Sequence, residues 1–173
     1  MKKIALVCLL FITSCSTSIE DYAEQNPLFD LFGFFEGKVS AWGMLQDFSG
    51  MQTRRFTVDI VGTVDGNCIT LDETFLFDDG EKQKRVWVIT QSDDGTYSGT
   101  AGDVVGVATG KVSGNVLHWV YKLRIPYDGD EITLTLDDWL YRQDQNHMFN
   151  LTSMKKFGIE VGKLTLFFQK QPD

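Results

Sequence analysis

Histidine and cysteine are scarce in this chain of 173 residues, which contains two histidines and three cysteines. His118 and His147 form no metal-binding spacing with each other or with a cysteine, so we predict no metal site. The sequence has no G-x-S-x-G nucleophile elbow, and nothing near Cys68 supplies the base that a nucleophilic thiol needs. We therefore assign no catalytic residue and expect no cofactor, which makes an enzyme the least favoured of the functions considered below.

Basic residues are also in short supply, with 16 lysines and arginines against 24 acidic residues and a net charge of −8. No basic stripe is available to follow a phosphate backbone, so nucleic acid is not an expected partner. Residues 1–14 contain two lysines and no acidic residue, so their removal changes the net charge to −10. An acidic domain is repelled by anionic lipid head groups, so membrane attachment should come from an anchor rather than from the domain surface.

The N-terminus lacks an apolar run of membrane-spanning length, because residues 4–12 fall short of the roughly 20 apolar residues that a bilayer requires. Two lysines before this run and small residues after it are typical of a secretory signal peptide. The stretch Ile12-Thr13-Ser14-Cys15 resembles a bacterial lipobox, in which the signal is cleaved before the cysteine and the cysteine receives lipid. We predict a lipoprotein signal peptide over residues 1–14 and lipidation of Cys15. An ordinary signal peptide with an incidental Cys15 is the alternative.

Lipidation would place the protein in the cell envelope. Each buried methylene contributes about 0.8 kcal/mol to membrane binding, so two or more acyl chains hold a protein firmly. In Gram-negative lipoproteins an aspartate after the cysteine commonly causes retention in the inner membrane, and this chain has Ser16 there. By resemblance, we expect the periplasmic face of the outer membrane. Residues 15–27 are then the lipidated cysteine and a polar tether, and residues 28–173 form one domain, which we expect to be monomeric.

The pattern after residue 27 predicts a short helix followed by strands. Asn26 and Pro27 are a helix start signal, so we expect a helical segment within residues 28–36 that ends at Gly37. From about residue 38 onward, apolar and polar residues alternate in runs separated by turn signals, which is typical of antiparallel strands. The turn signals are Ser49-Gly50, Asp65-Gly66-Asn67, Asp79-Gly80, Asp94-Gly95, Gly114-Asn115, Asp128-Gly129, Gln145-Asn146 and Phe157-Gly158.

We predict an all-β fold, an antiparallel meander barrel of about ten strands of the lipocalin or calycin type, with the short N-terminal helix covering one end. Closure removes the exposed edges that so many successive hairpins would otherwise leave. An open two-sheet sandwich is the alternative. Glycines 99, 102, 106, 110 and 114 predict bulges or bends within one stretch of the sheet.

Polar residues on otherwise apolar strand faces are the candidate site. Glu73, Asp138, Arg54 and Arg85 each lie in phase with apolar neighbours, and a buried charge must be paired or reach water. They predict either an Arg–carboxylate cluster that holds the head group of an amphipathic ligand or a salt bridge near the barrel mouth. The candidate ligand-contacting residues are Arg54, Glu73, Arg85, Trp87, Trp119, Tyr121 and Asp138.

Several longer stretches resemble a family of proteobacterial lipoproteins that carry the domain of unknown function DUF3833. The resemblance covers residues 28–170 and rests on AWGMLQDFSG, RRFTVDI, LDETFLFDDGE followed by RVW, YSGTAGDVVGVATG, GNVLHWVY, DDWLY and KKFGIEVGKLTLFF. It implies a lipid-anchored, lipocalin-like envelope protein with no assigned reaction. We expect a binding module for a small apolar or amphipathic molecule. A structural or protein-interaction lipoprotein with a side-chain-filled barrel is the alternative.

Overall fold

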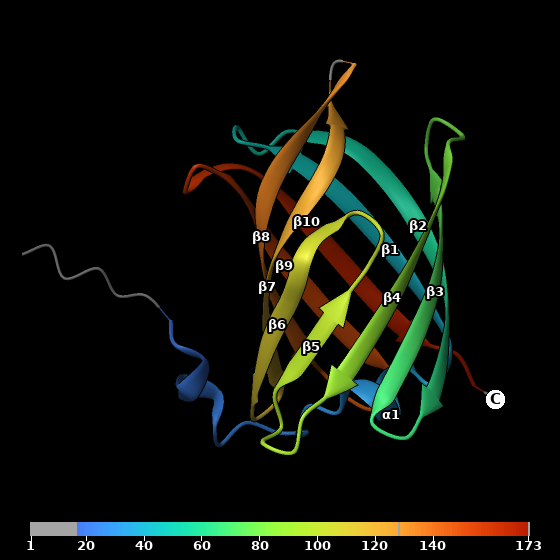
Figure 1. The fold of residues 1–173 in the computed structure, drawn as a ribbon, viewed down its shortest axis with the longest axis vertical. Helices are drawn as coiled ribbons and strands as arrows, with labels where there is room; N and C mark the ends of the chain where they lie inside the picture. Colours follow the sequence, from blue (N-terminus) through green and yellow to red (C-terminus); the bar gives the residue numbers. More distant parts are fainter. Residues whose placement is uncertain (1–16, 128, 173) are drawn as a thin grey trace, which may run out of the picture.

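The computed structural model describes residues 17–172 except residue 128, and these residues form a closed barrel of ten antiparallel strands (Figure 1). Each strand pairs with its neighbours in chain order, and β1 pairs with β10 to close the barrel. The strands are β1 (Gly37–Asp47), β2 (Gln52–Asp65), β3 (Cys68–Phe77), β4 (Lys82–Gln91), β5 (Tyr97–Thr100), β6 (Val104–Ser113), β7 (Val116–Tyr127), β8 (Asp130–Arg142), β9 (His147–Lys156) and β10 (Ile159–Lys170). The predicted meander barrel is confirmed, and the open sandwich is excluded. The predicted signal peptide, Cys15 and Ser16 lie outside the described residues.

Period-two alternation sets which side chains enter the barrel. In β7, the alternate residues Leu117, Trp119 and Tyr121 are buried. Val120 and Lys122, which flank Tyr121, are exposed. The same alternation runs through β2 and β4. The apolar set of each strand thereby forms a common core, and the polar set faces outward.

Glycine shapes the connection from β5 to β7. The register between β6 and β7 shifts between Val105 and Thr109, and Gly106 lies in this interval with φ of 78°, a left-handed conformation that favours glycine. This confirms the bend predicted for the glycine-rich stretch. The turn signals did not identify the connection at residues 101–103, which joins β5 to β6. This connection places Asp103 within hydrogen-bond distance of Arg85 in β4.

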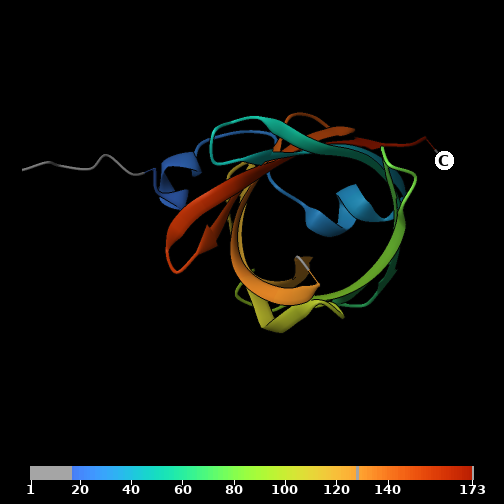
Figure 2. The same cartoon turned by 90° about the horizontal axis from the view of Figure 1, so that it is seen from above.

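Helix α1 (Leu31–Phe35) closes one end of the barrel, as predicted, and lies within the ring of strands when the barrel is viewed from above (Figure 2). Its start differs from the prediction, because Asp30 and not Asn26 is the N-cap: its Oδ1 accepts a hydrogen bond from the Gly33 amide at 2.9 Å. A Cβ at Gly62 would lie 1.9 Å from the Phe35 carbonyl oxygen, so glycine permits β2 to approach the helix.

Part of the predicted tether packs on the outer wall. The 3-10 helix η1 (Ile19–Tyr22) contacts β6 and β7, and the Tyr22 ring lies 6.1 Å from Trp139 and 5.8 Å from Tyr141 between centroids. Within residues 17–172, the structure contains no helix with the length and apolarity that a membrane crossing requires.

Candidate functional site

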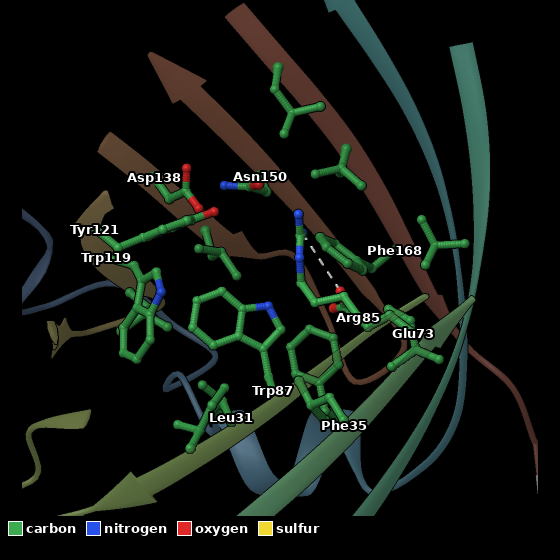
Figure 3. Close-up of a pocket in the computed structure, with 18 of the residues that line it drawn as sticks. Leu31, Phe35, Glu73, Arg85, Trp87, Trp119, Tyr121, Asp138, Asn150 and Phe168 are labelled. Atoms are coloured by element: carbon green, nitrogen blue, oxygen red, sulfur yellow. Dashed lines mark ion pairs between the residues drawn. The ribbon is translucent and has the colours of Figure 1, made fainter. Parts of the chain in front are cut away.

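The barrel interior contains a partly open cavity of about 120 Å³ above α1. Leu31 and Phe35 of α1 form its floor, and side chains from β2, β3, β4 and β7 to β10 form its walls (Figure 3). Most of the lining is apolar. The polar residues of the lining are Glu73, Arg85, Tyr121, Asp138 and Asn150. The cavity is therefore amphipathic, with an apolar floor and polar groups above it.

Most of the predicted site residues meet in this cavity although they come from four strands. Those that line it are Glu73 of β3, Arg85 and Trp87 of β4, Trp119 and Tyr121 of β7, and Asp138 of β8. The alternation of each strand identifies them, because every one shares a face with buried apolar residues. Their convergence follows from closure of the barrel, which places β3 and β4 across the interior from β7 and β8.

Arg54 is separate from this group. It lies near the start of β2, at the barrel end opposite α1, where its guanidinium pairs with Glu81 and, at 2.7 Å from Nη2 to Oδ2, with Asp79. Its Cζ atom lies 3.6 Å from the centroid of the Phe77 ring. Arg54 thus forms the salt bridge near the barrel mouth that we considered as the alternative, and it does not line the cavity.

Arg85 is held by two carboxylates. Its Nη2 donates to Asp103 Oδ2 at 2.6 Å and its Nε donates to the same oxygen at 3.0 Å, while Glu73 Oε2 lies 3.8 Å from Nη1. Burial raises the pKa of Glu73 to about 7, against the opposing influence of the Arg85 charge. The guanidinium is therefore largely neutralised by the protein's own acids before any ligand enters.

Asp138 is the most buried acid of the cavity, with an exposed fraction of 6%. Burial raises the pKa of its carboxyl group to about 7, although the neighbouring hydroxyl groups of Thr152 and Tyr121 favour the charged form. The Tyr121 hydroxyl faces this carboxyl group in Figure 3, and burial raises the pKa of Tyr121 well above its ordinary value. Oδ1 of Asp138 is buried and has no hydrogen-bond partner among the described residues.

Aromatic rings form the wall beside Asp138. The Trp87 ring meets Tyr121 edge to face at 5.4 Å between centroids, and it meets Trp119 in the same manner at 6.0 Å. The site thus offers aromatic surfaces next to hydrogen-bond acceptors. Across the part of the chain that the structure describes, no group of three or more His, Cys, Asp or Glu residues could hold a metal ion.

Sequence reasoning missed three polar residues of this region. Asn150 and Thr152 of β9 are buried and lie in phase with the buried Met148, so the alternation of β9 was a signal that could have identified them. Asp103 lies in the connection between β5 and β6, where no strand period applies. Only the folded barrel shows that Asp103 reaches Arg85.

Comparison with protein families decides where this barrel belongs. The model of a family of proteins of unknown function, DUF3833, matches residues 9–170. The chain belongs to this family. The match includes the cavity-lining strands of this DUF3833 protein, and it also includes Cys15. No curated protein matches the chain.

Several solved structures have a barrel similar to that of this DUF3833 protein. The S-type phycobiliprotein lyase from Guillardia theta is similar with a TM-score of 0.52 and 10% identity, over 80% of this chain and 89% of the lyase. A redesigned β-barrel bound to DFHBI has a TM-score of 0.40 and 10% identity, over 79% of this chain and 98% of its own. A second redesigned β-barrel has a TM-score of 0.41 and 12% identity, over 80% and 92% of the two chains. At such identity, the likeness to the lyase supports the fold and not a shared function.

Proposed function

We propose that this DUF3833 protein is an envelope lipoprotein whose barrel binds a small amphipathic molecule. One observation carries the proposal: the interior keeps a cavity of about 120 Å³ in which an apolar floor lies below buried polar groups. A barrel of this class is about wide enough either to be filled by side chains or to hold one small ligand. An interior that is left unfilled and lined in this manner favours the ligand.

The buried acids support a binding site over a purely structural interior. Replacing buried charged groups with apolar residues of similar volume is often neutral or stabilising, so they are weak contributors to stability. Glu73 and Asp138 nevertheless line the cavity, and their raised pKa values are typical of groups at functional sites. Convergent polar groups in an apolar pocket are also the usual composition of small-molecule sites.

The predicted anchor complements this site. Residues 16–18 separate Cys15 from η1, and three extended residues reach about 10 Å. Because η1 contacts the barrel wall, a lipidated Cys15 would hold the barrel close to the membrane surface. Amphipathic molecules concentrate at that surface, so a nearby cavity is well placed to take one up.

A barrel filled by its own side chains, with a structural or interaction role, is the second candidate. The observation that favours it is the packing around the cavity, where Leu123, Leu134 and Phe77 are buried but lie outside its lining. The cavity is also smaller than the roughly 300–1,000 Å³ of most ligand pockets.

Binding is tested on the Cys15→Ala chain, which lacks the anchor and keeps the whole barrel. We expect an apolar fluorescent probe to bind saturably and to alter tryptophan emission, and native mass spectrometry of the wild-type protein purified from its host to detect a small molecule. Val58 lines the cavity, so Val58→Phe is the control that should weaken probe binding. If the probe does not bind saturably to the Cys15→Ala chain without the Val58→Phe change, the ligand-binding proposal fails and the structural role remains.

The anchor is tested separately by membrane fractionation. Cys15→Ala should no longer partition into membranes, and Cys8→Ala, a matched change within the predicted signal peptide, should partition as the wild type does. If the Cys15→Ala protein stays membrane-bound after a high-salt and carbonate wash, the lipid anchor is refuted.

A further inference from the structure

The charge balance of the cavity bears on which ligand it takes. Arg85 is the cation of the lining, and its guanidinium already contacts Asp103 through two nitrogens and lies 3.8 Å from Glu73. An anionic head group would have to displace one of these carboxylates or share the guanidinium with them. It would also approach Asp138, so the carboxylates make the cavity unfavourable for an anion.

Asp138 favours a ligand that is a hydrogen-bond donor or a cation. Asp138 is buried and lines the cavity, and its Oδ1 has no hydrogen-bond partner among the described residues. A buried acceptor without a donor is costly, so a ligand that brings a donor to this carboxyl group reduces that cost. The groups that face its carboxyl group or act on its charge are Tyr121 of β7, Thr152 and Asn150 of β9, Arg85 and Glu73 from across the cavity, and Asp137 of the same strand. Within this set, Arg85 is the cation, and Asp103 neutralises it.

The aromatic wall suits the same kind of ligand. Trp87 meets both Trp119 and Tyr121 edge to face, and the three rings line the cavity together with Asp138. Aromatic faces attract organic cations, most strongly when water is excluded. The cavity of about 120 Å³ is close to the roughly 150 Å³ that holds one benzene molecule, so the ligand is of the size of one ring.

From this geometry we propose that the cavity binds a small organic ammonium ion, a protonated amine that donates to the carboxylate of Asp138 and lies against the Trp87–Trp119–Tyr121 wall. This inference rests on the ligand-binding function proposed above and names the class of its ligand. It assigns the role of head-group contact to Asp138 rather than to Arg85.

Three ligands that share one ring and differ in charge test this class. Benzylamine, benzyl alcohol and benzoate are titrated by calorimetry into the Cys15→Ala chain at pH 8. We expect benzylamine to bind at least about tenfold more tightly than benzyl alcohol, because it brings a charged hydrogen bond to a buried carboxylate. Benzoate should bind most weakly. Equal affinities, or tightest binding of benzoate, would overturn the ammonium proposal and leave ligand binding intact.

Asp138→Asn and Asp137→Asn form a matched pair on adjacent residues of β8. Asp138→Asn keeps the shape of the side chain and removes its charge, so benzylamine affinity should fall about tenfold or more, while benzyl alcohol affinity changes little. Asp137 pairs with Lys155 and His118 outside the cavity lining, so Asp137→Asn should change benzylamine affinity at pH 8 far less than Asp138→Asn does, although it removes the same charge. Equal loss in both variants would refute the assignment of Asp138.

Measuring benzylamine affinity as a function of pH, with Asp138 unchanged, tests the ammonium proposal even if Asp138→Asn does not fold. Because the pKa values of Asp138 and Glu73 are both about 7, the carboxylate fraction of the cavity and hence benzylamine affinity should rise at least about tenfold from pH 6 to pH 8. A flat or falling series contradicts the proposal. If the apolar probe binds and none of the three ring compounds does, the ammonium inference alone fails; if nothing binds, the proposed function fails with it.

Discussion

Replacing Asp138 with asparagine should stabilise the folded barrel at alkaline pH, because the wild-type carboxylate is buried with an unpartnered oxygen. Burial raises the pKa from the ordinary value of 3.8 to about 7. Between these two values the folded protein retains a proton that the unfolded chain has released. The contribution of Asp138 to the stability of the wild-type protein therefore decreases as the pH rises from about 4 to about 7 and levels off above the folded pKa.

The magnitude follows from the same two pKa values. One pKa unit corresponds to about 1.4 kcal/mol, so the cost of ionising buried Asp138 at pH 8 is about 4 kcal/mol, an upper value because relaxation and water entry reduce it. Asparagine has no charge to desolvate. Asp138→Asn should thus exceed the wild type in free energy of unfolding by up to about 4 kcal/mol at pH 8 and match it near pH 4.

Urea unfolding of the Cys15→Ala barrel, followed by tryptophan fluorescence from pH 4 to pH 8, measures this difference. Comparing variant with wild type at each pH isolates Asp138, since the other carboxyl groups titrate in both proteins. If Asp138→Asn is less stable than the wild type at pH 8, the carboxylate is well stabilised by its partners and the reasoning is wrong.

Asp137→Asn is the control with the opposite sign. Burial acts to raise the pKa of Asp137, but hydrogen bonds from Lys155 and His118 outweigh it, so the pKa is lowered overall. Stability from this group is present above the unfolded pKa and disappears as the pH falls through the folded pKa. Asp137→Asn should therefore cost about 1 kcal/mol at pH 8 and nothing at strongly acidic pH.

Further expected outcomes concern the other charged residues and the packing of the cavity. Arg85→Met leaves two carboxylates uncompensated and should cost about 3–5 kcal/mol in urea unfolding, whereas Arg54→Ala, whose partners are exposed, should cost about 1 kcal/mol or less. Val58→Phe should leave the melting temperature unchanged or raise it if the cavity accepts the ring, whereas a filled interior would lose about 1–3 kcal/mol to overpacking. Gly62→Ala should lower the melting temperature, because its Cβ would collide with the Phe35 carbonyl oxygen and displace α1; an unchanged melting temperature would show that the helix yields freely.

The sequence by itself determined the strand faces and nearly all of the turns. Alternation is a local property, since successive side chains of a strand point to opposite sides, so Trp119 and Tyr121 of β7 could be assigned to the interior without knowledge of the fold. The helix boundary was less secure. Asn26 and Pro27 predict a helix that starts at Pro27, but Asp30 caps α1 and the helix begins at Leu31.

Tertiary structure decided which of the predicted polar residues line the cavity. Arg54 and Arg85 have the same phase relation to apolar neighbours, but they lie at different heights in the barrel, so one meets acids at the mouth and the other enters the cavity. Asp103 comes from a turn distant in sequence, and the unpartnered oxygen of Asp138 is known only once every neighbour is placed. The cavity itself depends on the closure of ten strands and on the floor supplied by α1. Such non-local packing leaves no periodic signal in the sequence, so the sequence alone could not show that the barrel keeps an internal cavity.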